Sequence, residues 1–408
     1  MKRLCAVVLP LLLLLSLTGC GSWFNAEYYA EEPHVEQPLP TAAPTEAEQI
    51  PTVSNRSELR GTVLSFIRNW TERGEIAVRD YDGTLSDDLS EILDYATQED
   101  PIGAYAVDYA DAELSGTARS GSIALSLVFR RSAAEISSIV TVNGISGAKT
   151  KIQQGLTAYE TALTLRIRNY TETDFAQYVR DYCLEHLDQV AAIPALSAET
   201  YPKEGATRIL ELHFTYPDTR DALQLKLSSV KTVLSSALSY VSAGETDRDR
   251  VALLFRFLTT RFDYTVSETE PVMPAYELLS EGIAHSLSFA AVFRAECLAA
   301  GVDCRLVTGT WDDAEHSWNL LLLDGQWYCA DLMRAMQRGE TELRLLTPEE
   351  AIEEGYRWDT SAFPDEAAPQ VEPPAQPTEQ PVSEPPAPTE PLSTEPPTEE
   401  TTAPATAP

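Results

Sequence analysis

The spacing of apolar residues between positions 246 and 361 changes from helical to strand-like along the chain. Apolar residues first recur every three to four positions, which predicts helices over 247–262, 275–282 and 286–300. Gly301 then matches the left-handed residue that ends many helices. Beyond it the pattern alternates, which predicts strands over 302–310, 316–323 and 326–332.

The last two predicted strands are joined by Asp-Gly at 324–325, the strongest signal for a two-residue hairpin turn. The register of such a hairpin makes His316 and Asp331 diagonal neighbours on one face, within reach of an imidazole–carboxylate hydrogen bond. We expect this face to be buried against the helix that begins at Ser286. Its other members are Trp318, Leu320, Leu322, Trp327 and Cys329.

A short motif occurs twice in the middle of the chain. Ile-Arg-Asn-Trp-Thr-Glu at 67–72 returns as Ile-Arg-Asn-Tyr-Thr-Glu at 167–172, and each copy precedes a helical stretch, a proline and an alternating strand. The pattern predicts two α+β modules, 58–150 and 151–245, each in the order strand, helix, strand, helix. The shared Asn and Thr-Glu are expected to form a strand-to-helix turn with an N-cap.

Two segments of biased composition flank this region. Residues 21–57 and 362–408 are rich in Pro, Glu, Ala and Thr and lack apolar periodicity, so both are predicted to be disordered, extended spacers. The formal net charge of −33 argues against nucleic acid as a partner, because phosphates are bound by lysine and arginine. The acidity is interpreted as a source of solubility.

The first twenty residues have the layout of a secretory signal. Lys2 and Arg3 precede an apolar run at 6–17 that is too short to span a bilayer as a helix. The run ends in Leu-Thr-Gly-Cys at 17–20, which resembles the bacterial lipobox. The resemblance implies cleavage before Cys20 and lipid on its thiol, so the chain is expected to be secreted and anchored to the outer face of the bacterial membrane.

Four further cysteines follow Cys20, and they form no CxxC pair and no cluster with histidine at zinc spacing. They allow three disulfide pairings, of which one including Cys304–Cys329 is permitted outside the cell. Free, buried thiols are the other interpretation. No cofactor or metal is implied by these residues, which are Cys183, Cys297, Cys304 and Cys329.

Three motifs between residues 276 and 331 occur in a distinctive order. Ser-Leu-Ser-Phe-Ala opens the helix at 286–290, His-Ser-Trp-Asn follows at 316–319, and Trp-Tyr-Cys-Ala-Asp at 327–331. This order resembles the bacterial transglutaminase-like domain, a papain-like fold whose nucleophilic cysteine opens the helix. The fold class expected for the chain is therefore α+β, with the two modules followed by a transglutaminase-like domain at 246–361.

The resemblance also assigns positions to individual side chains. It implies that Ser286, His316 and Asp331 occupy the catalytic positions, with Ser286 where the family has its cysteine. A groove for a substrate or partner is expected beside Trp318, Asn319, Trp327 and Tyr328. A thiol at a helix N-terminus beside a histidine is readily ionised, whereas a serine hydroxyl must lose its proton to a base during attack.

Three interpretations follow. In the first, Ser286 is inert and the domain binds a partner such as cell-wall peptides or surface proteins without catalysis. In the second, Ser286, His316 and Asp331 form a working triad for acyl transfer or peptide hydrolysis. In the third, Cys329 is the nucleophile, or His285 and His316 contact a metal. A core role for Cys329 and a solvent-facing turn for His285 are the structural alternatives.

Overall fold

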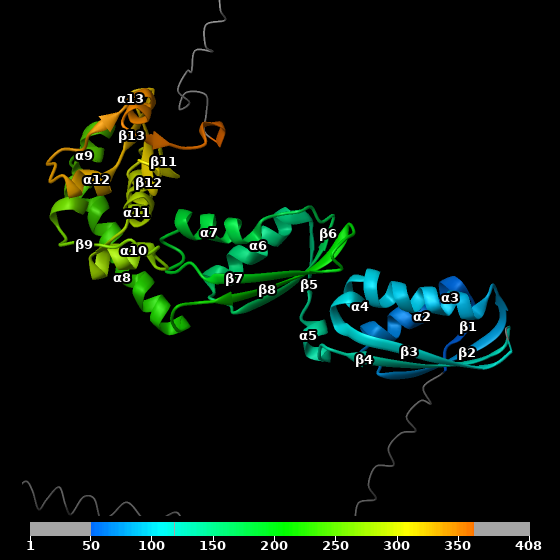
Figure 1. Ribbon diagram of the computed structural model, residues 1–408. Helices are drawn as coiled ribbons and strands as arrows, with labels where there is room; N and C mark the ends of the chain where they lie inside the picture. The colour runs from blue at the N-terminus through cyan, green and yellow to red at the C-terminus, as the bar shows by residue number, and fades with distance from the viewer. Residues whose placement is uncertain (1–49, 118, 363–408) are drawn as a thin grey trace, which may run out of the picture. The chain divides into compact units, whose positions relative to one another are not determined.

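The protein is α+β in the computed structural model, which describes residues 50–117 and 119–362 (Figure 1). The predicted signal, Cys20 and most of both predicted spacers lie outside the described residues. None of the described helices is long and apolar enough to cross a membrane. Strand β1 (Thr52–Asn55) lies within the predicted spacer 21–57, so regular structure begins earlier than predicted.

The part of the chain before residue 246 contains two four-stranded sheets that share one strand order. The orders are β1-β2-β4-β3 and β5-β6-β8-β7, in which the first pair is parallel and the second antiparallel. The first module contains β1, α2 (Arg56–Arg68), β2 (Arg73–Asp82), α3 (Leu85–Asp94), η1 (Tyr95–Glu99), α4 (Pro101–Ala106), β3 (Val107–Gly116), β4 (Gly121–Phe129) and α5 (Ala133–Ser137). The second contains β5 (Val140–Asn143), α6 (Gly144–Thr157), β6 (Ala162–Arg168), α7 (Phe175–Glu185), β7 (Ala195–Tyr201), β8 (Thr207–Thr215) and α8 (Arg220–Val241).

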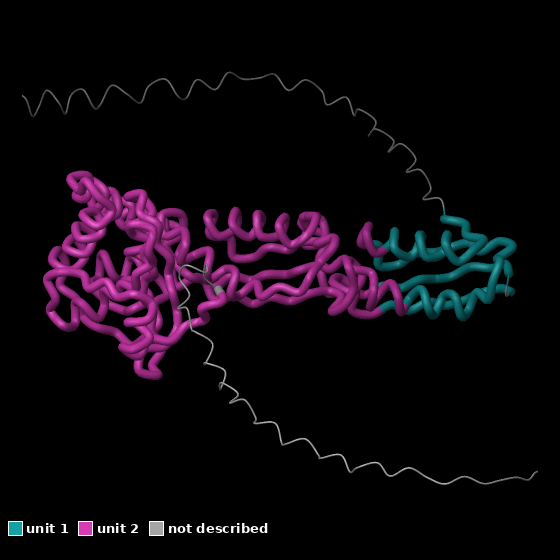
Figure 2. Tube along the Cα trace, turned by 90° about the horizontal axis from the view of Figure 1, so that it is seen from above, with its two compact units in different colours: residues 1–66, 71–93, 110–127 teal, residues 67–70, 94–109, 128–408 magenta. Residues whose placement is uncertain are grey.

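By compactness the chain divides into two units, drawn in different colours in Figure 2. The described residues up to 66, together with 71–93 and 110–127, form the first unit. The second unit contains 67–70, 94–109 and the described residues from 128 onward. The second sheet and the whole region from 246 to 362 therefore lie in one unit.

The motif that suggested the duplication does not mark equivalent positions. Its first copy runs from the end of α2 towards β2, whereas its second runs from the end of β6 towards α7. The equivalent positions are instead Trp70 and Tyr159, which follow α2 and α6 and share a left-handed φ of 53° and 52°. The predicted N-cap is also wrong, because α7 is capped by Asp174, and each module has two consecutive strands where one was predicted.

The region from 246 onward is built on a five-stranded antiparallel sheet, β14-β13-β12-β11-β15, and a small parallel pair, β10-β9. Its strands are β9 (Thr265–Val266), β10 (Ile283–Ala284), β11 (Cys304–Trp311), β12 (Ala314–Leu323), β13 (Gln326–Ala330), β14 (Leu345–Leu346) and β15 (Tyr356–Arg357). Its helices are α9 (Asp247–Thr260), α10 (Pro274–Tyr276), η2 (Glu277–Glu281), α11 (Ser286–Ala299), α12 (Leu332–Gln337), α13 (Pro348–Glu353) and η3 (Thr360–Ala362). The predicted helices and strands are all present, and Gly301 has the expected positive φ of 82°.

The hairpin of β12 and β13 has the predicted register. Leu323 pairs with Gln326 and Asn319 with Ala330. Asp324 and Gly325 have φ values of 54° and 79°, as a type I′ turn requires. Asp331 follows the end of β13 directly, which leaves it near the start of β12.

The face of this hairpin that carries His316, here the His316 face, is not covered by α11 as predicted. Its apolar residues pack with Leu346, Ala351 and Tyr356, from β14, α13 and β15. Helix α11 covers the opposite face, where Leu321 and Leu323 share a core with Phe289. Both faces are buried, so alternation along the strand does not reveal which helix covers which face.

The core under α11 also includes residues from before position 246. Leu184 of α7 and Val230, Ala237 and Val241 of α8 belong to the same buried cluster as Phe255 of α9. Helix α8 is therefore shared between the second sheet's module and the region of the candidate site.

Leu321→Ala is expected to destabilise the second unit by about 2–5 kcal/mol, because it leaves a cavity in a site that is 0% exposed. Leu225, which is 74% exposed, gives the matched control, and Leu225→Ala should change stability by less than about 0.5 kcal/mol. Urea unfolding followed by tryptophan fluorescence measures both. Equal effects would contradict the core assignment.

Candidate active site

Ser286 is the first residue of α11. The preceding residue, His285, is extended and caps the helix, and its Nδ1 accepts a hydrogen bond from the Leu287 backbone N–H at 3.2 Å. Ser286 is 8% exposed, and its Oγ accepts a hydrogen bond from the Ser317 backbone N–H at 3.3 Å. The hydroxyl therefore sits at a helix N-terminus, against the β12 backbone next to His316.

His316 and Asp331 form the predicted pair. Nε2 of the imidazole lies 2.6 Å from Oδ2 of the carboxylate, and the two side chains are only 12% and 9% exposed. Since an ionised carboxylate accepts hydrogen bonds and cannot donate them, the neutral ring carries its proton on Nε2 and leaves the Nδ1 lone pair available. No other described residue is hydrogen-bonded to the ring, so the pair is an oriented base with one open nitrogen.

Asp331 is held by two further hydrogen bonds. Its Oδ1 accepts from the Arg334 backbone N–H at 3.0 Å and so caps α12, while its Oδ2 also accepts from the Tyr356 hydroxyl at 2.8 Å. Burial, and then the Asp331 charge, raise the pKa of Tyr356, so this tyrosine keeps its proton and donates it to the carboxylate. The sequence did not indicate a role for Tyr356, because β15 has only two residues and lies 25 positions after Asp331.

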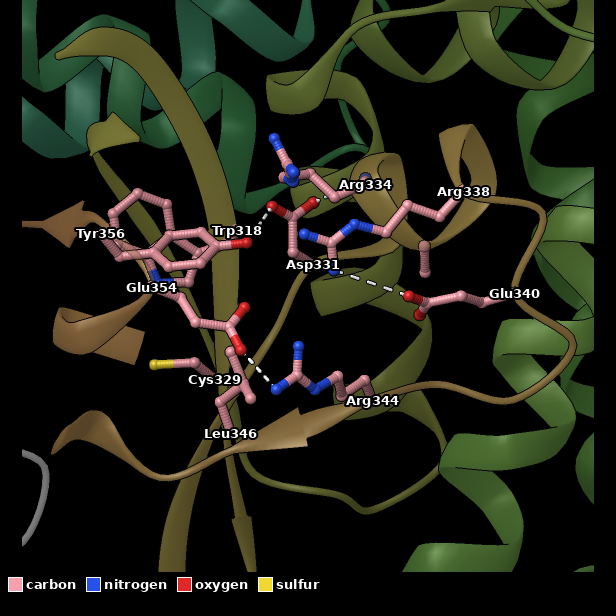
Figure 3. Close-up of a pocket in the computed structure, with 11 residues that line it drawn as sticks. Trp318, Cys329, Asp331, Arg334, Arg338, Glu340, Arg344, Leu346, Glu354 and Tyr356 are labelled. Carbon is pink, nitrogen blue, oxygen red and sulfur yellow. Dashed lines mark hydrogen bonds and ion pairs between the residues drawn. The ribbon is translucent and has the colours of Figure 1, made fainter. Parts of the chain in front are cut away.

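The environment of Asp331 is polar on one side and aromatic on the other. Figure 3 shows its carboxylate between Trp318 and Tyr356 on one side and Arg334 and Arg338 on the other. The small pocket beside it is also lined by ion pairs, Arg338 with Glu340 at 3.6 Å and Arg344 with Glu354.

The structure brings two of the three predicted catalytic side chains into contact. Within residues 50–117 and 119–362, no hydrogen bond joins the Ser286 hydroxyl to the His316 ring, because the Ser286 oxygen is directed to the Ser317 amide. His285 is half-buried, and burial is the main cause that lowers its pKa, so it is not the solvent-facing turn residue considered above. No group of three or more His, Cys, Asp and Glu side chains among the described residues is arranged to hold a metal ion.

The four predicted groove residues do not share one surface. Trp318 and Trp327 belong to the His316 face and are 1% and 6% exposed. Asn319 lies on the opposite face, where its Nδ2 donates to the Ala290 carbonyl of α11 at 2.8 Å. Tyr328 is half-buried on that face, with the Arg248 guanidinium 5.0 Å from its ring. Asn319 therefore links β12 to α11 by a hydrogen bond. Trp318 is a core residue on the other face.

The four cysteines of the described residues, Cys183, Cys297, Cys304 and Cys329, are buried and free. Burial raises the pKa of Cys329 to about 12, which keeps its thiol protonated and argues against Cys329 as the nucleophile. Cys304 belongs to the core under α11 and Cys329 to the His316 face, so the Cys304–Cys329 pairing is not formed. The interpretation as free core thiols is confirmed.

Residues 235–332 match the model of the Transglutaminase-like superfamily. The chain carries a transglutaminase-like domain. The match begins in α8, whose second half packs into the same core as α9 and α11, and it includes Ser286, His316 and Asp331. No curated protein matches the chain.

Several solved structures align with the chain at low overall similarity. A transglutaminase (TGase) is 11% identical with a TM-score of 0.24, over 42% of this chain and 50% of that one. A candidate cysteine protease from Cytophaga hutchinsonii is 15% identical with a TM-score of 0.24, over 38% and 65%. A candidate protease from Parabacteroides distasonis is 10% identical with a TM-score of 0.20, over 42% and 43%. The chain covers less than two thirds of each of these proteins.

Ser286→Cys tests whether the transglutaminase-like domain still activates a nucleophile. A thiol at the α11 N-terminus beside His316 should have a lowered pKa and react with iodoacetamide at pH 7 about tenfold faster than an exposed cysteine. Ser228→Cys on α8 supplies that exposed reference, and the unchanged chain gives the background. Adding His316→Ala should remove the difference. Equal rates for the two cysteines would contradict an activating His316.

Proposed function

We propose that the protein is a surface-anchored lipoprotein whose transglutaminase-like domain binds peptide or protein segments without catalysing their reaction. The proposed anchor is Cys20, and the proposed spacers are the parts of 21–57 and 362–408 that lie outside the described residues. Attachment to the outer face of the membrane would bring the domain near cell-wall peptides and other surface proteins. The order of basic, apolar and small residues before Cys20 supports the anchor.

One observation carries the proposed loss of catalysis: the Ser286 hydroxyl accepts the Ser317 N–H and is not joined to His316. A cysteine in this position would be ionised already in the resting protein, as a thiolate beside an imidazolium. Serine is far less acidic and depends on His316 to remove its proton at the moment of attack. The Ser286 oxygen accepts from the β12 backbone, and among the described residues its hydroxyl makes no hydrogen bond to the His316 ring, so the base that serine needs is not engaged. The His316–Asp331 pair keeps the shape of the site.

A second function, acyl transfer or peptide hydrolysis by Ser286, is favoured by the His316–Asp331 contact of 2.6 Å. The Tyr356 hydrogen bond fixes the same carboxylate, and Nδ1 of His316 is available to accept a proton. The backbone N–H groups at the start of α11 could stabilise an oxyanion. A rotation of the Ser286 side chain on substrate binding would complete this triad.

Labelling with a fluorophosphonate distinguishes the two functions. If the domain is not catalytic, the unchanged chain should take up no more label than the Ser286→Ala variant, with both proteins folded and at pH 7–8. It also predicts that both proteins retain the same partners from cell-wall peptide mixtures. Labelling of Ser286 that disappears in His316→Ala would instead establish the enzyme.

The anchor is tested separately through the two N-terminal cysteines. Cys20→Ala should abolish incorporation of labelled fatty acid and move the chain from the membrane fraction, because the acylated thiol is lost. Cys5→Ala is the matched control, since Cys5 lies in the predicted signal and should leave lipidation unchanged. Membrane fractionation after palmitate labelling measures both. Full lipidation of the Cys20→Ala chain would contradict the proposal.

A further inference from the structure

A cleft of about 470 Å³ lies towards the other end of α11 from Ser286. Its walls come from α8, from the last turns of α11 and from the end of α7. Leu234 and Leu238 of α8 and Leu298 of α11 give it an apolar lining, and Leu298 is 42% exposed. The volume falls within the range of sites for small ligands.

Glu296 also lines this cleft, and its carboxyl group is unusual. The residue is 1% exposed, and neither carboxyl oxygen has a hydrogen-bond partner in the described part of the chain. Burial raises its pKa well above the ordinary value. Tyr264 and Cys297 interact electrostatically with Glu296 but do not supply the missing bond, since the Tyr264 hydroxyl donates to the Leu258 carbonyl and the Cys297 thiol interacts with Cys304. An unpaired buried carboxyl destabilises the fold, so a ligand that pairs with it gains binding energy.

The rim of the cleft carries charges of both signs. Glu185 and Asp188 are exposed there, and Lys231 is the cation that the rim contributes. Glu185 lies 3.8 Å from Arg294, which compensates part of its charge. Lys231 and Arg294 therefore balance the two rim carboxylates, and the acidic group that a ligand would meet is the buried Glu296 carboxyl. A basic group on an apolar stem complements both this acid and the lining.

We propose that this cleft binds a primary alkylamine, with its ammonium group against Glu296 and its alkyl chain along Leu234, Leu238 and Leu298. The protonated carboxyl and the ammonium ion would form a carboxylate–ammonium pair and release one proton. Glu296 follows Ser286 by ten positions on α11, a distance of about 15 Å along the helix axis. The site is therefore separate from Ser286 and independent of its catalytic competence.

Titration calorimetry of the full chain with n-hexylamine hydrochloride tests the proposal. The expected result is saturable binding with release of a proton, seen as a heat that changes with the ionisation enthalpy of the buffer at constant pH. n-Hexanol should bind at least tenfold more weakly because it carries no charge. Nα-acetyl-lysine amide separates the two sources of such an amine: binding would identify lysine side chains as ligands, and its absence would identify free alkylamines.

Two variants locate the site. Glu296→Gln should weaken hexylamine binding at least tenfold and abolish proton release, whereas Glu281→Gln, an exposed carboxyl elsewhere, should change neither. Proton release by the unchanged chain is informative even if Glu296→Gln does not fold. No saturable binding of hexylamine, binding without proton release, or equal binding of hexanol would each overturn the proposal.

Discussion

The candidate site depends on one hydrogen bond, from His316 Nε2 to Asp331 Oδ2 at 2.6 Å. It forms because a two-residue turn sets the register of β12 and β13 and leaves Asp331 at the end of one strand, near the start of the other. Tyr356 and the α12 backbone then fix the carboxylate. The ring is thereby oriented with Nδ1 open, which is the arrangement a general base requires.

The position of the hairpin also determines what surrounds Ser286. Helix α11 is fastened to β12 by Asn319, so its first residue is held against the strand next to His316. A thiol there would be activated by the helix end and the imidazole together, whereas the Ser286 hydroxyl oxygen accepts the Ser317 N–H in this structure. The transglutaminase-like domain of this chain thus has a serine at the start of α11, beside the strand that carries His316.

The sequence allowed most of the elements near the site, and the His316–Asp331 contact, to be predicted. Alternation and the Asp-Gly turn determine the register, and register determines which side chains meet. The elements that cover each face of β12 could not be predicted. Both faces of this strand are buried, so apolar residues occur on both and the alternation does not distinguish one face from the other. The contact of Tyr356 with Asp331 and the burial of Glu296 depend on tertiary packing between distant segments. The repeated motif at 67–72 and 167–172 has nearly the same residues in both copies, but the copies lie at different places in the two modules.

The His316–Asp331 pair holds together without a hydrogen bond to Ser286, and nitrogen-15 NMR of the histidine rings tests this most directly. The account predicts that neutral His316 carries its proton on Nε2, and that Ser286→Ala leaves both of its ring nitrogen shifts unchanged. Asp331→Asn should shift the Nε2 resonance. A proton on Nδ1, or a change in the Nδ1 shift when the Ser286 hydroxyl is removed, would contradict the account.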